Sequence, residues 1–229
     1  MGTSLLRVDW CDYKAAKYAV EHWHYSQCMP AGKIVKIGVW EHEAFIGVVL
    51  FSRGANNTLG SPYGLSQIQV CELTRIALTN HITPVSKIMM LAIRMLRKQS
   101  PGVRLIISFA DPLQGHYGGI YQATNWLYCG DSHAADEYIV KGKRMHGRSM
   151  RSLYGTHVGK EFIKKTLGSS KHRYLMPLDD EMRKQIAPLA KPYPKRPNQS
   201  ATNPMEAGRC DSDPDAPELN EVFNECEEH

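Results

Sequence analysis

The sequence lacks the patterns that mark several specialised classes of protein. No apolar run approaches the roughly 18 residues of a membrane-spanning helix, and residues 1–7 have neither the basic nor the apolar region of a secretion signal. Six cysteines are scattered without a Cys-x-x-Cys pair, which argues against a zinc ribbon and a disulfide scaffold. No segment is repeated along the chain. We therefore expect a soluble, unexported protein with reduced thiols.

The remaining composition is that of a folded domain. Hydrophobic residues make up 42% of the 229 residues and charged residues 22%, close to globular averages. The net charge of +5 is unevenly distributed. From residue 188 onward the chain has four basic and nine acidic residues, so residues 1–187 carry a net charge of +10. A basic domain is typical of proteins with a polyanionic partner such as nucleic acid, although many unrelated enzymes are also mildly basic.

The last part of the chain differs from the rest. Residues 188–229 contain seven prolines, few aliphatic side chains and a strongly acidic end. Such a segment cannot bury enough apolar surface to offset the entropy lost on ordering. We therefore expect two parts, a folded domain at 1–187 and a proline-rich, acidic, disordered tail at 188–229.

Local patterns in the domain predict alternating strands and helices. Strands are expected at 5–9, 33–40, 45–51, 67–78, 104–109, 126–129 and 137–140, where β-forming residues alternate or cluster. Helices are expected after an N-cap at Asp12, at 85–98 after Pro84, and at 116–124. Residues 41–43 and 141–144 indicate hairpin turns. This order implies an α/β fold, a mixed sheet with helices on both faces.

The element order resembles the Gcn5-related N-acetyltransferase superfamily, and so does the segment 119–128, in which a helix bearing Tyr121 ends at Asn125. One feature departs from that superfamily. Its members usually bind the pyrophosphate of coenzyme A with a glycine-rich loop, whereas residues 79–86 contain no glycine. Side chains there would obstruct close approach of a pyrophosphate to the backbone.

A narrower resemblance accounts for this departure. Six ordered motifs are similar to the Mom family of bacteriophage DNA-modification proteins: His-Tyr-Ser at 24–26, Gly-Val-Trp at 38–40, Cys-Glu-Leu-Thr-Arg-Ile-Ala at 71–77, Ser-Phe-Ala-Asp-Pro at 108–112, Gly-His at 115–116 and Ile-Tyr-Gln-Ala-Thr-Asn-Trp at 120–126. The resemblance spans roughly residues 5–187. It implies conversion of adenine N6 in DNA to N6-carbamoylmethyladenine, which protects phage DNA from host restriction enzymes.

This reaction needs an exposed adenine and a means of removing a proton from N6. The partner would be double-stranded DNA, and base flipping would deliver the amine to a pocket where aromatic rings can stack on the base. The aromatic residues available are Tyr25, Trp40, Tyr117 and Tyr121, each of which could equally pack in the core.

Four residues are expected to serve the reaction. His24 follows the first helix and accepts a proton near neutral pH, and the resemblance attributes family function to the matching pair His24 and Tyr25. Tyr121 belongs to the same expected catalytic set. Asp111 ends a buried strand at the sheet edge where α/β proteins bind ligands, and either orients a base, holds a metal or forms a simple Asp-Pro turn.

The resemblance implies that Arg75, Ser108 and Asn125 bind the two-carbon donor. Arg75 would pair with a phosphate or carboxylate and Ser108 would bond a carbonyl, unless Arg75 only pairs with Glu72. The donor is either acetyl-CoA-like or derived from glycine, because the carbamoylmethyl group has the skeleton of glycinamide. The resemblance also implies iron as a cofactor, with His24, Asp111 and His116 as candidate ligands, although no spacing requires a metal.

Residues 141–173 contain ten Lys or Arg and one acidic residue. They are the expected contact with the DNA backbone, through Lys141, Lys143, Arg144, Arg148 and Arg151, and the alternative is a solvated basic face. The resemblance implies a location in the cytoplasm of the infected bacterial host, with no membrane partner, and a homodimer stays open. Two rival functions are an ordinary CoA-dependent N-acetyltransferase and a non-enzymatic DNA-binding protein.

Overall fold

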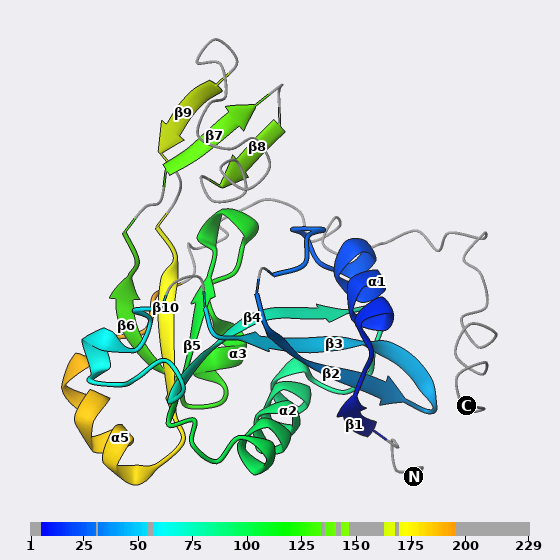
Figure 1. The fold of residues 1–229 in the computed structure, drawn as a ribbon, viewed down its shortest axis with the longest axis horizontal. Coiled ribbons are helices and arrows are strands. Elements are labelled where there is room, and N and C mark those ends of the chain that lie inside the picture. Colours follow the sequence, from blue (N-terminus) through cyan, green and yellow to red (C-terminus); the bar gives the residue numbers. More distant parts are fainter. Residues whose placement is uncertain are drawn as a thin grey trace. The chain divides into compact units, whose positions relative to one another are not determined.

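The protein is described by a computed structural model, which describes residues 6–30, 32–54, 57–133, 136–140, 143–146, 163–167 and 170–195. Among these residues, seven strands form one mixed sheet in the order β1-β2-β3-β4-β5-β10-β6 (Figure 1). The strands are β1 (Leu6–Trp10), β2 (Ile34–Glu41), β3 (Ala44–Ser52), β4 (Val70–Leu78), β5 (Leu105–Ala110), β6 (Leu127–Asp131) and β10 (His172–Pro177). The pairing of β4 with β5 is parallel and the other pairings are antiparallel.

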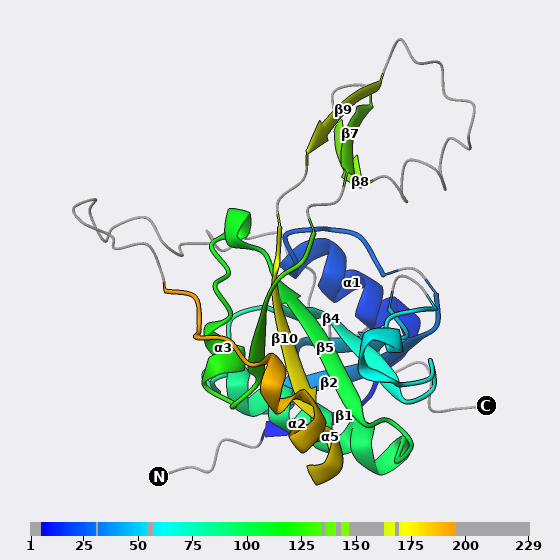
Figure 2. The same ribbon diagram turned by 90° about the vertical axis from the view of Figure 1, so that its left-hand side faces the viewer.

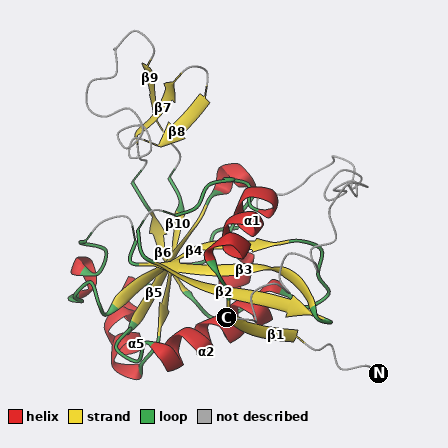
Figure 3. Cartoon of the chain, turned by 45° about the vertical axis from the view of Figure 1, so that its right-hand side comes forward, coloured by secondary structure: helices red, strands yellow, loops and turns green. Residues whose placement is uncertain are grey.

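Helices cover both faces of this sheet, which confirms the expected class. They are α1 (Tyr13–Trp23), α2 (Val85–Gln99), α3 (Gly119–Gln122) and α5 (Asp180–Ile186), with short 3₁₀ helices at Ser61–Tyr63, Pro112–Gln114 and Ala187–Leu189. Alternation along β3 explains why α1 and α2 lie on opposite faces (Figure 3). Val48 and Leu50 are buried with α1, whereas Val49 and Phe51 are buried with α2.

Helix α1 begins where the sequence predicts. The Asp12 side chain accepts a hydrogen bond of 2.7 Å from the backbone N–H of Ala15, as an N-cap does. The buried residues Ala16, Ala19 and Val20 follow at helical spacing and pack on the sheet. The helix ends at Trp23, so residues 24–28 leave it as a loop.

Two expected elements differ in extent. The strand expected from residue 67 begins at Val70, because the Gln69 side chain accepts hydrogen bonds from the Ser66 N–H and hydroxyl and closes a turn. The helix expected at 116–124 spans only Gly119–Gln122. Gly118 precedes it at φ +80°, where an added Cβ would lie 2.3 Å from the Tyr174 hydroxyl, so the chain turns sharply there.

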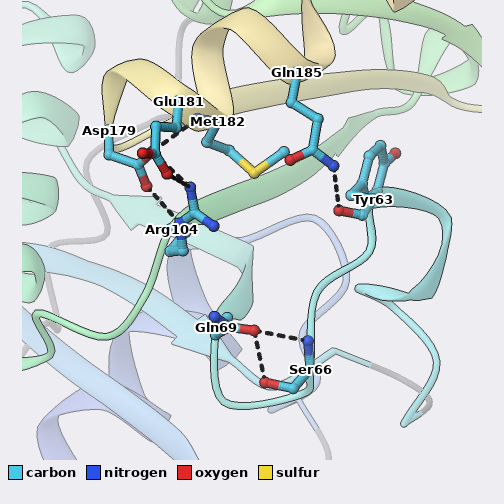
Figure 4. A network of polar contacts seen from close by, with 8 residues as sticks. All are labelled: Tyr63, Ser66, Gln69, Arg104, Asp179, Glu181, Met182 and Gln185. Carbon is cyan, nitrogen blue, oxygen red and sulfur yellow. Dashed lines mark hydrogen bonds and ion pairs between the residues drawn. The ribbon is translucent and has the colours of Figure 1, made fainter.

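The sequence did not predict β10 or α5. Only the first two residues of β10, His172 and Arg173, belong to the basic stretch 141–173, and the strand fills the sheet between β5 and β6, with Tyr174 and Leu175 fully buried. Helix α5 follows it and lies beside it (Figure 2). Its N-cap is Asp179, whose side chain accepts from the Met182 N–H at 2.7 Å and binds Arg104 at the start of β5 (Figure 4).

The segment between β6 and β10 forms a separate small sheet in the order β8-β7-β9. Its strands are β7 (Asp136–Val140), β8 (Lys143–His146) and β9 (Ile163–Leu167), and both pairings are antiparallel. Lys143 and Arg144, expected in a turn, therefore lie on a strand. In the described chain no helix is long and apolar enough to cross a membrane.

The domain continues past the expected boundary at residue 188. Its compact unit extends to Lys195. The Lys191 N–H donates to the Tyr128 carbonyl at 2.8 Å, and the Tyr193 hydroxyl donates to the Trp126 carbonyl at 2.8 Å. The rest of the expected tail, from residue 196, lies outside the described residues, so its disorder stays a prediction.

Candidate functional site

The candidate site lies where β4 and β5 part. Their parallel pairing consists of Val70 with Leu105, Cys71 with Ile106 and Glu72 with Ile107. The next residue of β5, Ser108, is 1% exposed, and its hydroxyl donates to the Leu73 carbonyl at 2.9 Å. At this point the hydrogen bond from the Ser108 side chain takes the place of the backbone hydrogen bonds that join the two strands.

Tyr121 closes the same gap from α3. Its hydroxyl lies 2.7 Å from the Ser108 hydroxyl, which already donates to Leu73, so Tyr121 is the donor in this bond. The ring is buried against Trp126 and Tyr174, each with a centroid distance of 4.9 Å. Burial raises the pKa of Tyr121 to about 12. Ser108 and Tyr121 are therefore brought together, as a buried bridge between strands.

The end of α1 carries the exposed part of the site. The His24 and Tyr25 rings lie 4.3 Å apart between centroids, and the Tyr25 ring lies 5.7 Å from that of His116. Tyr25 is 51% exposed, although a tyrosine usually buries much of its ring. An aromatic surface beside a histidine pair can receive a flat ring.

His24 is held in one orientation by Ser26. The Ser26 N–H donates to His24 Nδ1 at 3.1 Å, and the Ser26 hydroxyl lies 2.8 Å from the same nitrogen. Burial, together with the positive charges of Arg75, His116 and Lys171, lowers the pKa of His24 from 6.5 to about 4. The imidazole is therefore neutral at physiological pH.

Arg75 brings a permanent positive charge to this region from β4. It pairs in register with Leu50, a residue buried against α1, so both lie on the α1 face of the sheet. Its Nη1 donates to the Thr74 carbonyl at 2.7 Å. Its Nε–H is buried and has no hydrogen-bond partner among the described residues. An unsatisfied buried donor is costly, and the Trp126 Nε1–H and Arg173 Nε–H share this feature, so Arg75 stays a candidate ligand-binding residue.

Asp111 lies at the end of β5. Its Oδ1 accepts from the Leu113 N–H at 3.1 Å, and its Oδ2 lies 3.3 Å from Nζ of Lys171, just before β10. The carboxylate thus holds Lys171 and the 3₁₀ helix. In the part of the chain that the structure describes, no group of three or more His, Cys, Asp or Glu could hold a metal. The expected iron site at His24, Asp111 and His116 is therefore unsupported.

Other expected residues lie apart from this cluster. Asn125 is exposed at φ +59° and forms the turn between α3 and β6, a conformation that asparagine tolerates. The Trp40 ring packs against Phe45 and carries the Arg7 guanidinium at 4.1 Å. Tyr117 is half-buried, and its carbonyl accepts from the Tyr174 hydroxyl. The roles expected for these residues therefore stay predictions.

The expected DNA-binding residues are only partly described. Lys143 and Arg144 lie on β8, where they pair in register with Val140 and Ile139. Lys141, Arg148 and Arg151 lie outside the described residues. The basic segment therefore contains a β-sheet between β6 and β10, and its contact with DNA stays a prediction.

The loop before α2 contains no glycine, and its backbone N–H groups bind a carboxylate of the protein itself. Glu41, expected in a hairpin turn, is instead the buried last residue of β2. Its carboxylate accepts from the Ile82 N–H at 2.7 Å, the Thr83 N–H at 2.8 Å and the Thr83 hydroxyl at 2.5 Å. These hydrogen bonds lower the pKa of Glu41 to about 2. A carboxylate of the protein thus occupies backbone donors that precede a helix N-terminus.

Three residues of the site were missed from the sequence. Ser26 lies two residues after His24, a local spacing that could have indicated its bond to the ring. Lys171 was counted only as one charge in a basic stretch, because β10, which positions it, was not predicted. No local pattern in the sequence indicated the role of Glu41, since its partners lie about 40 residues further along the chain.

Comparisons with known proteins agree with the sequence motifs. The model of the Mom protein family matches residues 5–195. A curated relative, methylcarbamoylase mom of Escherichia phage Mu, is 26% identical over 156 residues. The aligned region covers 66% of this chain, and the chain spans 64% of the length of that relative.

Two solved structures are similar in fold. One is FeeM, an N-acyl amino acid synthase from uncultured soil microbes, with a TM-score of 0.46, 11% identity, and coverage of 81% of this chain and 97% of that chain. The other is a candidate acetyltransferase from Acinetobacter baylyi, with a TM-score of 0.43, 11% identity, and coverage of 78% of this chain and 95% of that chain.

Proposed function

Because the chain belongs to the Mom protein family, we propose that it is a transferase that modifies adenine in phage DNA. The proposed product is N6-carbamoylmethyladenine, and the proposed benefit is protection from host restriction enzymes. The name of the relative from phage Mu, a methylcarbamoylase, agrees with this chemistry. The observation that carries the proposal is the half-exposed Tyr25 ring, which lies 4.3 Å from the His24 ring between centroids, beside a histidine whose pKa burial, Arg75, His116 and Lys171 lower to about 4.

Tyr25 is the proposed platform for the flipped adenine. A base taken out of the duplex loses its stacking, and an exposed aromatic ring restores part of it. Tyr25 is 51% exposed and already contacts His24 and His116 on its inner side. Trp40 and Tyr121 are engaged in packing, which leaves Tyr25 as the best supported stacking residue.

The proposed donor is a two-carbon unit without a nucleotide pyrophosphate, such as one derived from glycine. Backbone N–H groups near a helix N-terminus are the usual ligands of a phosphate. Here those of Ile82 and Thr83 are taken by the Glu41 carboxylate, which would also repel a pyrophosphate. The rival function of a CoA-dependent acetyltransferase is therefore disfavoured. Arg75, with its buried Nε–H unpaired, is the proposed ligand of an oxygen of the donor.

The proposed DNA contact is the basic segment between β6 and β10. Lysines and arginines there would neutralise backbone phosphates and confer affinity without sequence preference. Lys171 connects this segment to the site, since it lies at the start of β10 and pairs with Asp111. The flipped base and the duplex would thus be bound by neighbouring parts of one chain.

The experiment expresses the chain in bacteria, digests their DNA to nucleosides and measures modified adenine by mass spectrometry. Wild-type protein should yield adenine heavier by one carbamoylmethyl group. The variant Tyr25→Ala should lower the yield about 5-fold to 150-fold, because stacking on an aromatic ring contributes about 1–3 kcal/mol per base. Tyr25→Phe should retain most of the activity.

Tyr13→Ala is the matched control. Tyr13 is 54% exposed at the start of α1, so its loss removes a similar aromatic surface at the end of the helix away from Tyr25. It should leave the yield unchanged. No modified adenine with wild-type protein would contradict the proposed function, and equal losses in both alanine variants would contradict the role of Tyr25. A non-enzymatic DNA-binding protein would give no modified adenine in any variant.

A further inference from the structure

The hydrogen bonds of His24 determine which of its nitrogens carries the proton. A backbone N–H can only donate, so the bond from the Ser26 N–H requires a lone pair on Nδ1. The Ser26 hydroxyl lies 2.8 Å from Nδ1 and 3.5 Å from the Cys28 carbonyl and has one proton to donate, so the tautomer is inferred from the Ser26 N–H alone. In a neutral imidazole the proton is then on Nε2. His24 therefore presents an N–H, and not a lone pair, on its remaining polar edge.

The surroundings of His24 keep the ring neutral. Arg75 reaches it from β4, His116 from the loop after β5, and Lys171 from the start of β10, and all three oppose a further positive charge. The Tyr25 ring covers one face of the imidazole. Asp111, the nearby acid at the end of β5, is paired with Lys171. A neutral histidine whose Nδ1 is occupied is a poor proton acceptor and a good hydrogen-bond donor.

We propose that His24 uses its Nε2–H to bind the carbonyl oxygen of the two-carbon donor and is not the group that accepts the proton of adenine N6. This inference rests on the proposed function and differs from the sequence-based expectation, in which His24 is the base. Ser26 is the positioning residue, since its N–H and hydroxyl hold Nδ1 in place.

The chemistry of the donor fits this role. Both candidate donor classes, a thioester and a glycine derivative, contain a carbonyl group. An oxygen that is polarised or gains negative charge is stabilised by fixed donors in a partly buried site. The cations around His24 favour the same polarity, because Arg75 and Lys171 attract the oxygen that His24 would bind.

The first test reads the tautomer directly, without activity. The full chain is labelled with ¹⁵N-histidine, and the ring nitrogens are assigned by NMR through the loss of signals in His24→Gln. We expect a neutral His24 at pH 7 with the proton on Nε2. A proton on Nδ1, or a charged ring at pH 7, would overturn the inference whether or not the protein modifies adenine.

The second test uses two amides that place a donor at different points of the imidazole. The amide nitrogen of His24→Gln lies near the position of Nε2, and that of His24→Asn lies near Nδ1. Neither amide is a base. We expect His24→Gln to retain modified adenine within about 3-fold of wild type, and His24→Asn and His24→Ala to lose about 10-fold, as the loss of a hydrogen bond of about 1.5 kcal/mol predicts.

The possible outcomes distinguish a failure of the role inferred for His24 from a failure of the proposed adenine modification. If wild-type protein modifies adenine and His24→Gln is as inactive as His24→Ala while still folded, by circular dichroism, His24 acts as a base and the inference fails. If wild-type protein gives no modified adenine, the proposed function fails, and the carbonyl-binding role fails with it. In that case the NMR result still decides the tautomer.

Discussion

Charged side chains beside the two ends of β5 differ in whether their hydrogen-bond donors have partners. At the start of β5, Arg104 donates to both oxygens of Asp179 at 2.8 and 2.9 Å and to Glu181 at 3.3 Å (Figure 4). On the neighbouring strand β4, beyond the last residue pair that it forms with β5, the Nε–H of Arg75 has no hydrogen-bond partner among the described residues. A second polar group there, His24, has its pKa lowered to about 4 by burial and by the neighbouring Arg75, His116 and Lys171.

This difference separates structure from function. Around Arg104, each charge satisfies another charge or a backbone group, as expected of residues that only stabilise a fold. The Nε–H of Arg75, in contrast, has no acceptor among the described residues, which costs stability unless a ligand supplies one. We therefore interpret the Arg104 end as structural and the Arg75 end as the binding site.

Loss of the Asp179 side chain should give the largest change in stability without a loss of function. Asp179→Ala removes the N-cap of α5 and the partner of Arg104, so we expect the free energy of unfolding to fall by about 1 kcal/mol or somewhat more. Asp179→Asn should cost less, because asparagine caps helices about as well as aspartate. Urea denaturation of the three proteins measures both effects.

Both Asp179 variants should modify adenine as well as wild type does per folded molecule. A loss of activity greater than the loss of folded protein would mean that the Arg104 end also serves the reaction. Such a result would contradict the division of β5 into a structural end and a functional end.

A smaller effect is expected in the pH dependence of stability. The hydrogen bond from Arg104 lowers the pKa of Asp179 from 3.8 to about 2, so the ionised form is favoured in the folded state. This stabilisation is fully present above the unfolded pKa of about 3.9 and is lost as pH falls toward the folded pKa. The difference in unfolding free energy between wild type and Asp179→Asn should therefore shrink from pH 5 to pH 2.

Glu41 does not interfere with that comparison, because its lowered pKa is common to both proteins. The measurement is urea denaturation of each protein at several pH values in this range. A difference that stays constant down to pH 2 would mean that the Arg104 pair does not favour the ionised carboxylate.

Much of the fold followed from local sequence patterns. The Asp12 cap, the apolar spacing of α1 and α2, and the alternation in β2 and β3 act over a few residues, so they are visible in the sequence. Strand β10 was hidden, because His172–Pro177 follows a run of basic residues and forms only through long-range pairing with β5 and β6. The short α3 was also mispredicted, since the conformation of Gly118 depends on the distant Tyr174.

The sequence indicated which residues belong to the candidate site better than it indicated what each of them does. Family motifs pointed to His24, Tyr25, Arg75, Ser108, Asp111 and Tyr121, and the structure brings Ser108 to Tyr121 and His24 to Tyr25. It does not bring Asn125 to them, because that residue makes an exposed turn. The protonation of His24 could not be predicted, since it depends on its burial, on Ser26 and on Arg75, His116 and Lys171, which the fold gathers around it.

The most direct test of the binding site at the Arg75 end compares the two arginines in one assay. Arg75→Met and Arg104→Met each remove one guanidinium and keep an apolar side chain, and modified adenine is measured per folded molecule. We predict that Arg75→Met loses nearly all modification, whereas Arg104→Met matches wild type per folded molecule despite lower stability. Equal activity of the two variants, at any level, would contradict the assignment of the site to the Arg75 end of β5.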